Sequence, residues 1–262
     1  MGRILAVTNQ KGGVGKTTTS INLAASLAAC KRRVLLIDFD PQGNATMGSG
    51  VDKHAIERSA YGLLLGECSA EAATLKVEAG GYWLIPANAD LTAAEVKLMG
   101  AIGREGKLKK ALATARYEYD FVLVDCPPSL NLLTINALAA ADGVFIPMQC
   151  EYYALEGLAA LVDTIGQIHD SVNPKLELYG ILRTMFDPRN NLAIDVSDQL
   201  LQHFGDKVYR TAIPRNVRLA EAPSFGLPAL QHDKGSRGAL AYLALAGELI
   251  RREETARRAS AY

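Results

Sequence analysis

A glycine-rich turn near the start of this chain constrains its fold more than any other feature. The apolar run Ile4–Val7 is followed by the segment Lys11–Thr17, of sequence KGGVGKT, and then by a helix-like stretch from Thr18 to Ala29. A strand, a glycine-rich turn and a helix in this order form an anion site, because the N–H groups of the turn and the positive end of the helix dipole face the same point. This order predicts a phosphate site at the carboxyl end of the first strand.

The residues of the turn suit a triphosphate. Its three glycines permit a positive φ and a close approach of the backbone to the ligand. Lys16 can reach the β- and γ-phosphates and Thr17 can ligate Mg²⁺, as in a phosphate-binding P-loop. The usual pattern G-x-x-x-x-G-K-[ST] has glycine at position 10, where this chain has Gln10, and an additional lysine, Lys11, opens the loop. Gln10 and the additional Lys11 therefore separate this loop from the usual P-loop pattern and indicate a particular subclass of P-loop proteins.

Short β-rich runs alternate with helical runs along most of the chain. Two of them, Val34–Ile37 and Phe121–Val124, are continuous and apolar, as strands covered on both faces of a parallel sheet are. The alternation predicts a doubly wound α/β fold, a mostly parallel β-sheet flanked by helices, with its ligand at the carboxyl ends of the strands. The expected strands are Ile4–Thr8, Val34–Asp38, Trp83–Pro86, Phe121–Asp125, Val144–Pro147, Leu178–Leu182 and Val208–Ile213. The expected helices are Lys16–Ala29, Leu91–Met99, Lys107–Ala115, Leu132–Ala140, Leu155–His169, Ile194–His203 and Ala239–Arg251.

The composition is that of an ordinary globular chain. The formal net charge is zero, so any binding to DNA requires a local basic patch. No two cysteines form a C-x-x-C pair, which speaks against a disulfide or metal framework and favours a reducing cytoplasm. We expect one domain over residues 1–262, with neither a signal peptide nor a membrane span. The tail, residues 251–262, lacks Leu, Ile, Val, Phe and Met, and is expected to fray beyond the last helix.

Acidic residues end two of the apolar runs. Asp38 and Asp40 follow one run, and Asp125 ends another. Because the carboxyl ends of parallel strands meet at one crevice, these carboxylates are expected near a Mg²⁺-phosphate group, where one holds the water shell of the metal and another orients the attacking water. A lone aspartate at a strand end more often forms a turn or caps a helix. The phosphate loop favours a site role for Asp40 and Asp125, whereas Asp38 stays open between the two roles.

Several blocks of the sequence resemble the ParA/Soj family of chromosome-partition ATPases over about residues 3 to 250. Three of them correspond to the deviant Walker A, Walker A′ and Walker B elements, and three more have no counterpart in generic P-loop proteins. The blocks are Lys11–Thr18, Asp38–Asn44, Val122–Ser129, Pro147–Gly157, Thr184–Arg189 and Ile213–Gly226. The resemblance implies a slow ATPase that uses ATP and Mg²⁺.

The resemblance also implies roles for particular residues. Lys16 would bind the phosphates, and Lys11 would be a signature lysine that reaches the nucleotide of the other subunit in an ATP-sandwich homodimer, with Gly12 at that interface. Asp40 would position the hydrolytic water. Met185 would either pack on the base or belong to the core. The implied nucleotide-binding set is Lys11, Gly12, Gly13, Val14, Gly15, Lys16, Thr17, Thr18, Asp125, Met185, Pro214 and Asn216, and the implied metal set is Thr17, Asp40 and Asp125.

DNA is the second ligand that the resemblance implies. The segment from Lys207 to Arg218 carries four basic residues and no acidic one, a pattern that in isolation is more often a solvated loop. Arg189 and Arg218 fall where ParA/Soj proteins contact the phosphate backbone without sequence preference. Arg215 is a further candidate for DNA or for the nucleotide. A centromere-binding partner of the ParB type would trigger hydrolysis and release from the nucleoid.

Two other classes share parts of this pattern. A MinD-like positioning ATPase ends in an amphipathic membrane helix, whereas the tail from Arg251 offers no bulky apolar face. An iron–sulfur carrier of the nitrogenase-reductase or Mrp type needs cysteines that are paired or shared across a dimer. Cys126 and Cys150 lie near strand ends but have no close cysteine partner in the sequence, so we expect both to be small buried apolar residues.

Overall fold

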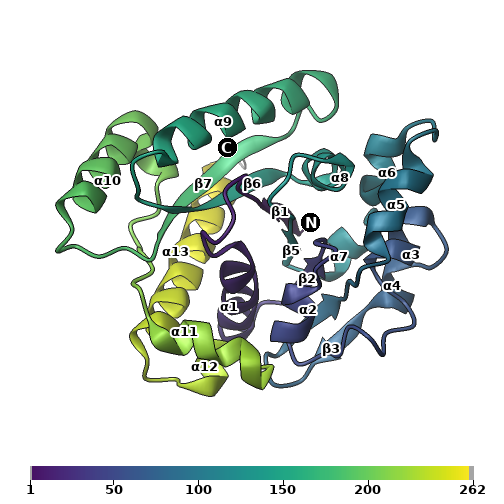
Figure 1. Cartoon of the computed structure of the whole chain (residues 1–262), viewed down its shortest axis with the longest axis horizontal. Coiled ribbons are helices and arrows are strands. Elements are labelled where there is room, and N and C mark those ends of the chain that lie inside the picture. The colour runs from purple at the N-terminus through teal and green to yellow at the C-terminus, as the bar shows by residue number, and fades with distance from the viewer. Residues whose placement is uncertain (1, 260–262) are drawn as a thin grey trace.

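A seven-stranded sheet organises the molecule, and the structure, a computed structural model, describes residues 2–259 of the chain. The strands lie in the order β3-β4-β2-β5-β1-β6-β7, and all neighbours pair in parallel except β3 with β4 (Figure 1). This arrangement confirms the predicted mostly parallel α/β fold. The strands are β1 Arg3–Val7, β2 Val34–Asp38, β3 Leu75–Val77, β4 Tyr82–Ile85, β5 Phe121–Asp125, β6 Gly143–Gln149 and β7 Glu177–Thr184.

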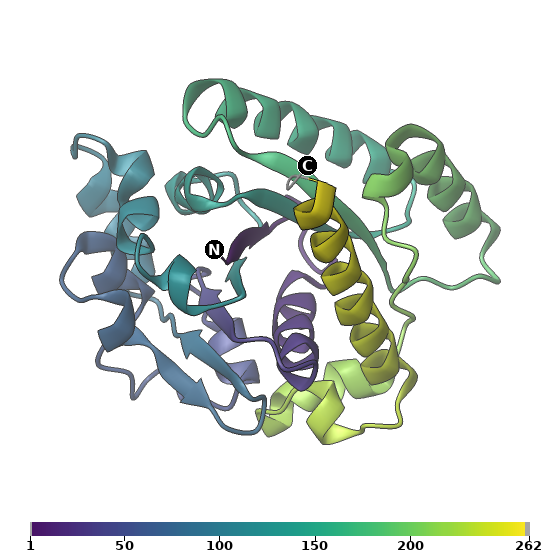
Figure 2. The ribbon, with the colours of Figure 1, turned by 180° about the vertical axis from the view of Figure 1, so that it is seen from behind.

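Helices cover both faces of the sheet (Figures 1 and 2). One buried cluster joins the sheet to α1 and α13, and the other joins the opposite face to the helices from α3 to α10. No helix within residues 2–259 has the length and apolar character that crossing a membrane requires. The helices are α1 Lys16–Ala29, α2 Asn44–Gly48, α3 Ala60–Leu65, α4 Ala70–Ala73, α5 Leu91–Leu98, α6 Lys107–Ala111, α7 Ala115–Glu118, α8 Leu132–Ala140, α9 Ala154–Ser171, α10 Asn191–Phe204, α11 Val217–Glu221, α12 Ala229–His232 and α13 Arg237–Ala259.

Strand β1 shows why the fold has two cores. Ile4 and Ala6 belong to one buried cluster, while Leu5 and Val7 belong to the other. Successive side chains of a strand point to opposite faces, so a central strand covered on both sides must be apolar at every position. The continuous apolar runs of the sequence therefore lie at the centre of the sheet.

The strand order reverses direction at β1, and this reversal indicates where a ligand site lies. β1 lies between β5 and β6, and the chain leaves it toward β2 on one side before returning to β6 on the other. In open α/β sheets a ligand binds at such a switch point, outside the carboxyl ends of the strands. Asp125 at the end of β5 pairs in register with Val7 on one side and with Asp38 on the other. The turn after β1 and both acidic strand ends therefore meet at one edge.

Two strand assignments differ from the sequence-based expectation. The segment Val208–Ile213 is not a strand: Val208 makes only an isolated bridge to Ile181. The N–H groups of Tyr209 and Ile213 still donate to carbonyl oxygens of β7, at 2.9 and 2.8 Å, but those of Arg210 and Thr211 donate to the Glu248 carboxylate of α13, both at 2.9 Å, and this interrupts the strand pairing. In the other direction, the short edge strand β3 was not expected, because two of its three side chains are exposed and give no apolar run.

The last helix is longer than expected. α13 continues to Ala259, so the prediction of a frayed tail is wrong for residues 251–259, while residues 260–262 lie outside the described part. Polar contacts hold this end. Glu253 is buried and accepts hydrogen bonds from Arg3 at 3.0 Å and from the Tyr179 hydroxyl at 2.8 Å. Arg252 donates to the carbonyl oxygens of Asp206 and Val208 at 2.7 and 3.0 Å. A search for apolar residues misses this kind of anchor.

Candidate active site

The turn between β1 and α1 has the backbone of an anion cradle. Gly13 and Gly15 have φ values of 74° and 87°, in the left-handed region that side chains disfavour. A Cβ atom on Gly12 or Gly13 would meet nothing within 4 Å, so the turn is open toward solvent. α1 begins at Lys16 with no side-chain cap. Its first N–H groups are therefore free to bind an anion, as the sequence predicts.

Lys16 is buried in this cradle. The residue is 7% exposed, and its Nζ donates to the carbonyl oxygen of Lys11 at 3.2 Å. The other two N–H groups of this ammonium have no hydrogen-bond partner among residues 2–259. Burial lowers the pKa of Lys16, and the charges of Asp125 and Asp40 oppose that shift. A buried cation with free donors beside uncapped helix N–H groups fits a phosphate oxygen.

Asp125 joins the end of β5 to the first turn of α1. Its fully buried carboxylate accepts hydrogen bonds from the hydroxyls of Thr17 at 2.8 Å and Ser20 at 2.7 Å. Burial raises the pKa of Asp125 to about 6, although these hydroxyls oppose the rise. Ser20 was not singled out from the sequence. Its spacing of three residues from Thr17, which puts both on one side of a helix, is the signal that could have identified it.

The open question about Asp38 is answered by its partners. Its carboxylate accepts from the backbone N–H and the hydroxyl of Thr46, both at 2.7 Å, and from the N–H of Asp40 at 3.2 Å. These bonds fix the turn after β2 and the start of α2. Burial, and then the charge of Asp125, raises the pKa of Asp38 to about 7. These contacts favour the structural role for Asp38, in the turn that carries Asp40.

Asp40 follows the end of β2, where Asp38 pairs in register with Asp125 and the Phe39 N–H donates to the Asp125 carbonyl oxygen, so it lies at the same edge of the sheet as Asp125. Its charge raises the pKa of Asp125 and opposes the lowering of the pKa of Lys16. It is 8% exposed, and one of its carboxylate oxygens accepts from the N–H of Gln42 at 2.9 Å. No three His, Cys, Asp or Glu side chains converge on a metal-sized point within the described chain. A Mg²⁺ ion at this edge would thus rely on the Thr17 hydroxyl, water and phosphate oxygens as well as on carboxylates, which suits its preference for few protein ligands.

Lys11 has the opposite environment to Lys16. Its side chain is 47% exposed and forms an ion pair with Glu151, which follows β6 and is 43% exposed. The Lys11 N–H donates to the side chain of Asn9 at 3.0 Å, and this fixes the start of the loop. Next to Glu151, the rings of Tyr152 and Tyr153 pack edge to face at 5.0 Å and are more than 70% exposed. Sequence reasoning did not single out Glu151 or the two tyrosines.

The segments expected to line the base lie side by side at the end of β7. The Thr184 hydroxyl donates to the carbonyl oxygen of Val14 at 2.8 Å and so ties β7 to the phosphate loop. Met185 follows with a φ of 48°, an uncommon conformation for a residue with a side chain. The next residue, Phe186, bridges to Pro214. The side-chain oxygen of Asn216 is buried and has no hydrogen-bond partner, so it is free to accept from a ligand.

The predicted DNA contacts differ in how they are held. Arg189 is 88% exposed and makes two side-chain hydrogen bonds to Asp187, at 2.9 and 2.8 Å. Arg218 on α11 pairs with Glu221 at 2.8 Å and with Asp233 at 3.3 Å. Arg215 is exposed and makes no ion pair with another described residue. Two of the three guanidinium groups would therefore have to leave or share a carboxylate to bind a phosphate.

The cysteines near the strand ends are packed in the core, as expected. Cys126 and Cys150 are 1% and 5% exposed and belong to the larger buried cluster. Burial raises the pKa of the Cys126 thiol well above its usual value and that of Cys150 to about 11. Both therefore remain thiols near neutral pH, and a thiol is a poor metal ligand.

Comparisons with known proteins agree with this geometry. Residues 2–178 match the family model described as an AAA domain. The chain is 52% identical over 253 residues to the chromosome partitioning protein ParA of Caulobacter vibrioides, covering 96% of this chain and 95% of that one. It is 51% identical over 249 residues to the sporulation initiation inhibitor protein Soj of Bacillus subtilis, covering 95% and 98%.

A solved structure of cobyrinic acid a,c-diamide synthase from Mycobacterium smegmatis, with a bound ATP analogue and magnesium, is also similar. The TM-score is 0.85 and the identity 39%, over 98% of this chain and 97% of that one. The fold and the loop define a P-loop ATPase in which a second lysine opens the phosphate loop. The near full-length identities to ParA and Soj are more specific, and the chain belongs to the ParA/Soj family of chromosome-partitioning ATPases.

The raised pKa of Asp38 gives the stability of the nucleotide-free protein a defined dependence on pH. The folded-state pKa of about 7 lies above the value of 3.8 in an unfolded chain, so the folded state binds the proton more tightly. The contribution of Asp38 to stability is therefore full below pH 3.8 and is lost as the pH rises through 7. In urea unfolding, the stability of Asp38→Asn relative to wild type should improve by more than about 1 kcal/mol between pH 5 and pH 8.

The exposed Asp90 provides the control for that measurement, since Asp90→Asn removes the same charge from the protein surface. A constant offset between Asp38→Asn and wild type across this pH range would contradict the buried, proton-binding state of Asp38.

Proposed function

We propose that this protein is an ATP-driven partition switch. ATP and Mg²⁺ bind at the loop between β1 and α1, two ATP-bound chains form a sandwich homodimer, and the dimer binds DNA without sequence preference. A partner of the ParB type stimulates hydrolysis and release. The observation that carries the proposal is the contrast between two lysines of one loop: Lys16 is buried in the cradle, whereas Lys11 is exposed at its mouth.

The cradle residues divide the work on the nucleotide. The free N–H groups of Lys16 and of the α1 N-terminus bind phosphate oxygens. Thr17 can turn its hydroxyl oxygen to Mg²⁺ while Asp125 holds that hydroxyl and the water shell, with Asp40 nearby. When bound, Mg²⁺ supplies neutralisation of phosphate charge. Asp40 accepts a hydrogen bond from the hydrolytic water and orients it toward the terminal phosphate.

The base is assigned to the end of β7. The unpartnered side-chain oxygen of Asn216 is an acceptor for an exocyclic amino group such as that of adenine. Pro214, which bridges to Phe186, and the partly buried Met185 offer apolar surface in the same two segments. The left-handed backbone at Met185 supports a site role over a plain core role, because strained conformations concentrate at ligand sites.

The dimer supplies what a single chain lacks. The Lys11 side chain is exposed and forms an ion pair with Glu151. An exposed ion pair of this kind contributes about 0–1 kcal/mol, so exchange of Glu151 for the phosphates of a facing chain is favourable. Tyr152 and Tyr153 stand beside this pair as exposed aromatic surface, the residue type that is enriched at interfaces. Gly12, whose Cα faces open space, lets two loops approach closely.

DNA binding is assigned to exposed arginines outside the cradle. Arg189 and Arg218 contact backbone phosphates, and Arg215 serves either DNA or the nucleotide. The carboxylates that hold Arg189 and Arg218 compete with DNA, so binding by one chain is weak and strengthens when two chains present their arginines together. Contacts to phosphates release counterions and make binding strongly salt-dependent. Through these contacts with DNA, the protein would be cytoplasmic and associated with the nucleoid.

Neither alternative class gains support from a specific observation. The last turns of α13, from Arg251 to Ala259, carry charged and small residues, and Glu253 is turned into the protein, so no amphipathic apolar face is available for a membrane. ATP-dependent sedimentation with liposomes would favour the MinD-like class instead. The burial of Cys126 and Cys150 disfavours an iron–sulfur carrier, and a coloured protein after anaerobic reconstitution would support one.

Two substitutions separate nucleotide binding from hydrolysis. Lys16→Ala removes the buried cation and should abolish ATP binding measured by calorimetry. Asp40→Ala should retain ATP but lose turnover, by about 100-fold or more if the carboxylate positions the water, and should accumulate a long-lived dimer in size-exclusion chromatography. Tight ATP binding by Lys16→Ala, or turnover at the wild-type rate by Asp40→Ala, would overturn the corresponding assignment.

Two substitutions with opposite expected effects on DNA binding test the DNA assignment, one at Arg218 and one at its partner Glu221. Arg218→Glu should lose DNA binding while it still dimerises with ATP, because the side chain lies on α11, outside the cradle. Glu221→Gln should tighten binding a few-fold at low salt, since it weakens the competing ion pair. Fluorescence anisotropy with a labelled duplex and a non-hydrolysable ATP analogue measures both. If Arg218→Glu fails to dimerise, the residue is structural and the assignment is wrong.

A further inference from the structure

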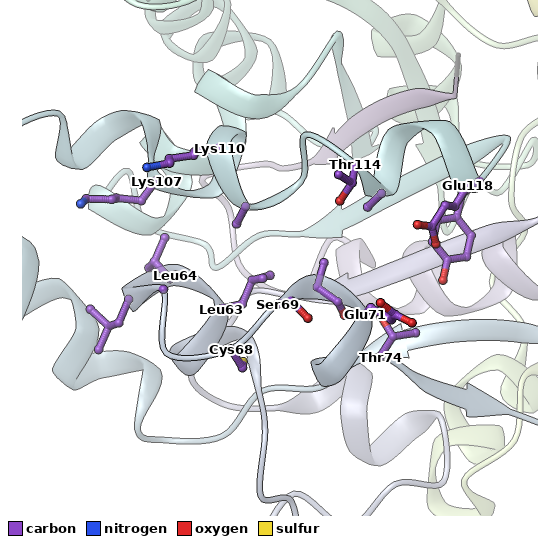
Figure 3. Close-up of a pocket in the computed structure, with 16 residues that line it drawn as sticks. Leu63, Leu64, Cys68, Ser69, Glu71, Thr74, Lys107, Lys110, Thr114 and Glu118 are labelled. Atoms are coloured by element: carbon purple, nitrogen blue, oxygen red, sulfur yellow. Dashed lines mark hydrogen bonds between the residues drawn. The ribbon is translucent and has the colours of Figure 1, made fainter.

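A groove lies on the side of the molecule formed by α3, α4, α6 and α7 (Figure 3). Its volume is about 540 Å³, within the range of about 300–1,000 Å³ that is usual for ligand pockets. The groove shares no lining residue with the phosphate loop or with the segments at the end of β7. Nothing in the proposed function uses it, so a ligand there would bind without displacing a nucleotide.

The two ends of the groove carry opposite charge. Lys107 and Lys110, one turn apart on α6, stand at one end, and Glu71 of α4 and Glu118 of α7 stand at the other (Figure 3). None of these four side chains forms an ion pair or hydrogen bond with another residue in the range 2–259. By contrast, Glu67 pairs with Lys97 and Glu105 pairs with Arg104.

Glu71, Glu118 and Tyr119 all line the groove. Burial and then the charge of Glu118 raise the pKa of the Tyr119 hydroxyl, the Arg33 guanidinium that lies over the Tyr119 ring opposes the rise, and Glu71 adds a smaller increase. These carboxylates come from opposite walls of the groove, since Glu71 belongs to α4 and Glu118 to α7. The acidic end therefore offers a basic group one carboxylate from each of two helices.

The floor between the charged ends is apolar. Leu63 and Leu64 of α3 are 2% and 1% exposed, and Ala70 and Ala115 are 7% and 4% exposed. Small side chains on both walls leave room above the leucines. Ser69 is already engaged as the cap of α4, where its hydroxyl accepts from the N–H of Ala72 at 3.1 Å. The floor therefore suits an aliphatic side chain better than a polar one.

We propose that this groove docks a peptide segment of a partner protein, with acidic side chains at Lys107 and Lys110, an aliphatic side chain on the leucine floor, and a basic side chain between Glu71 and Glu118. Charge complementarity at both ends selects the partner and fixes the direction of its chain. An extended segment fits better than a compact ligand, because the two charged ends are separated by the apolar floor. This docking site stands independently of the proposed partition function.

A labelled peptide tests the proposal directly. The probe is a fluorescein-labelled peptide with two glutamates, the centre Ser-Leu-Ala-Leu-Ser and two lysines, titrated with the wild-type protein by fluorescence anisotropy. Saturable binding is expected, and replacement of all four charged peptide residues by glutamine should weaken it about tenfold or more. The protein variant K107E/K110E should weaken binding to a similar extent. Lys109→Glu is the matched control, because Lys109 is exposed on the same helix but does not line the groove.

A charge swap guards against misfolding of the variant. A peptide with lysines at both ends should bind K107E/K110E more tightly than it binds wild type. Hydrogen–deuterium exchange should show protection of residues 63–74 and 107–119 when the original peptide is bound. The proposal is overturned if wild type shows no saturable binding up to roughly 1 mM peptide, if Lys109→Glu weakens binding as much as K107E/K110E, or if the swapped peptide shows no preference.

Discussion

The buried carboxylate of Asp125 is the joint on which the active site depends. It accepts hydrogen bonds from Thr17 and Ser20 at the start of α1, and its strand pairs with β1 on one side and β2 on the other. One residue thus connects the phosphate loop, the first turn of the helix and the edge where the Asp40 turn begins. Burial of this carboxylate disfavours its charged form and raises the pKa of Asp125 to about 6. A buried carboxylate that is satisfied only by hydroxyls favours a nearby cation, and Lys16 and a bound Mg²⁺ ion would provide positive charge at this place.

The same loop separates two functions by burial. Lys16 is enclosed and donates to the carbonyl oxygen of Lys11, which suits the proposed role of binding the nucleotide of its own chain. Lys11 is exposed and pairs with Glu151 on the rim, which leaves it within reach of another molecule. A loop in which Gln10 replaces the usual glycine and a lysine follows it is therefore suited to a site shared between two chains. The arginines proposed to contact DNA, Arg189 and Arg218, are likewise held only by exposed ion pairs, with Asp187 and with Glu221 and Asp233, which are weak enough to be exchanged for another partner.

Sequence reasoning recovered the parts of the molecule that are governed by local pattern. The central strands, α1 and α8 follow from apolar runs and helical periodicity, and the meeting of Lys16, Asp40 and Asp125 follows from parallel strand ends. What it missed depends on contacts between distant residues. The role of Asp38 is decided by Thr46, and the end of α13 is held by Arg3 and Tyr179. The segment from Val208 to Ile213 has the sequence pattern of a strand, but Glu248 accepts from the N–H groups of Arg210 and Thr211 in its middle and interrupts its pairing with β7. Polar anchors of this kind leave no periodic trace in the sequence.

The central claim is that Lys11 acts on the nucleotide of a facing chain, and the most direct test is the ATPase rate of mixed variants. Lys11→Ala keeps Asp40 but offers no lysine to its neighbour, whereas Asp40→Ala offers the lysine but has no group to orient water. Each variant alone should be inactive under conditions in which the wild type turns over ATP. An equal mixture should recover roughly a quarter of the wild-type rate, because half of randomly formed dimers are mixed and each mixed dimer has one complete site. A mixture that is no more active than the two variants measured separately would contradict the shared site. Lys11 would then act on the nucleotide bound by its own chain.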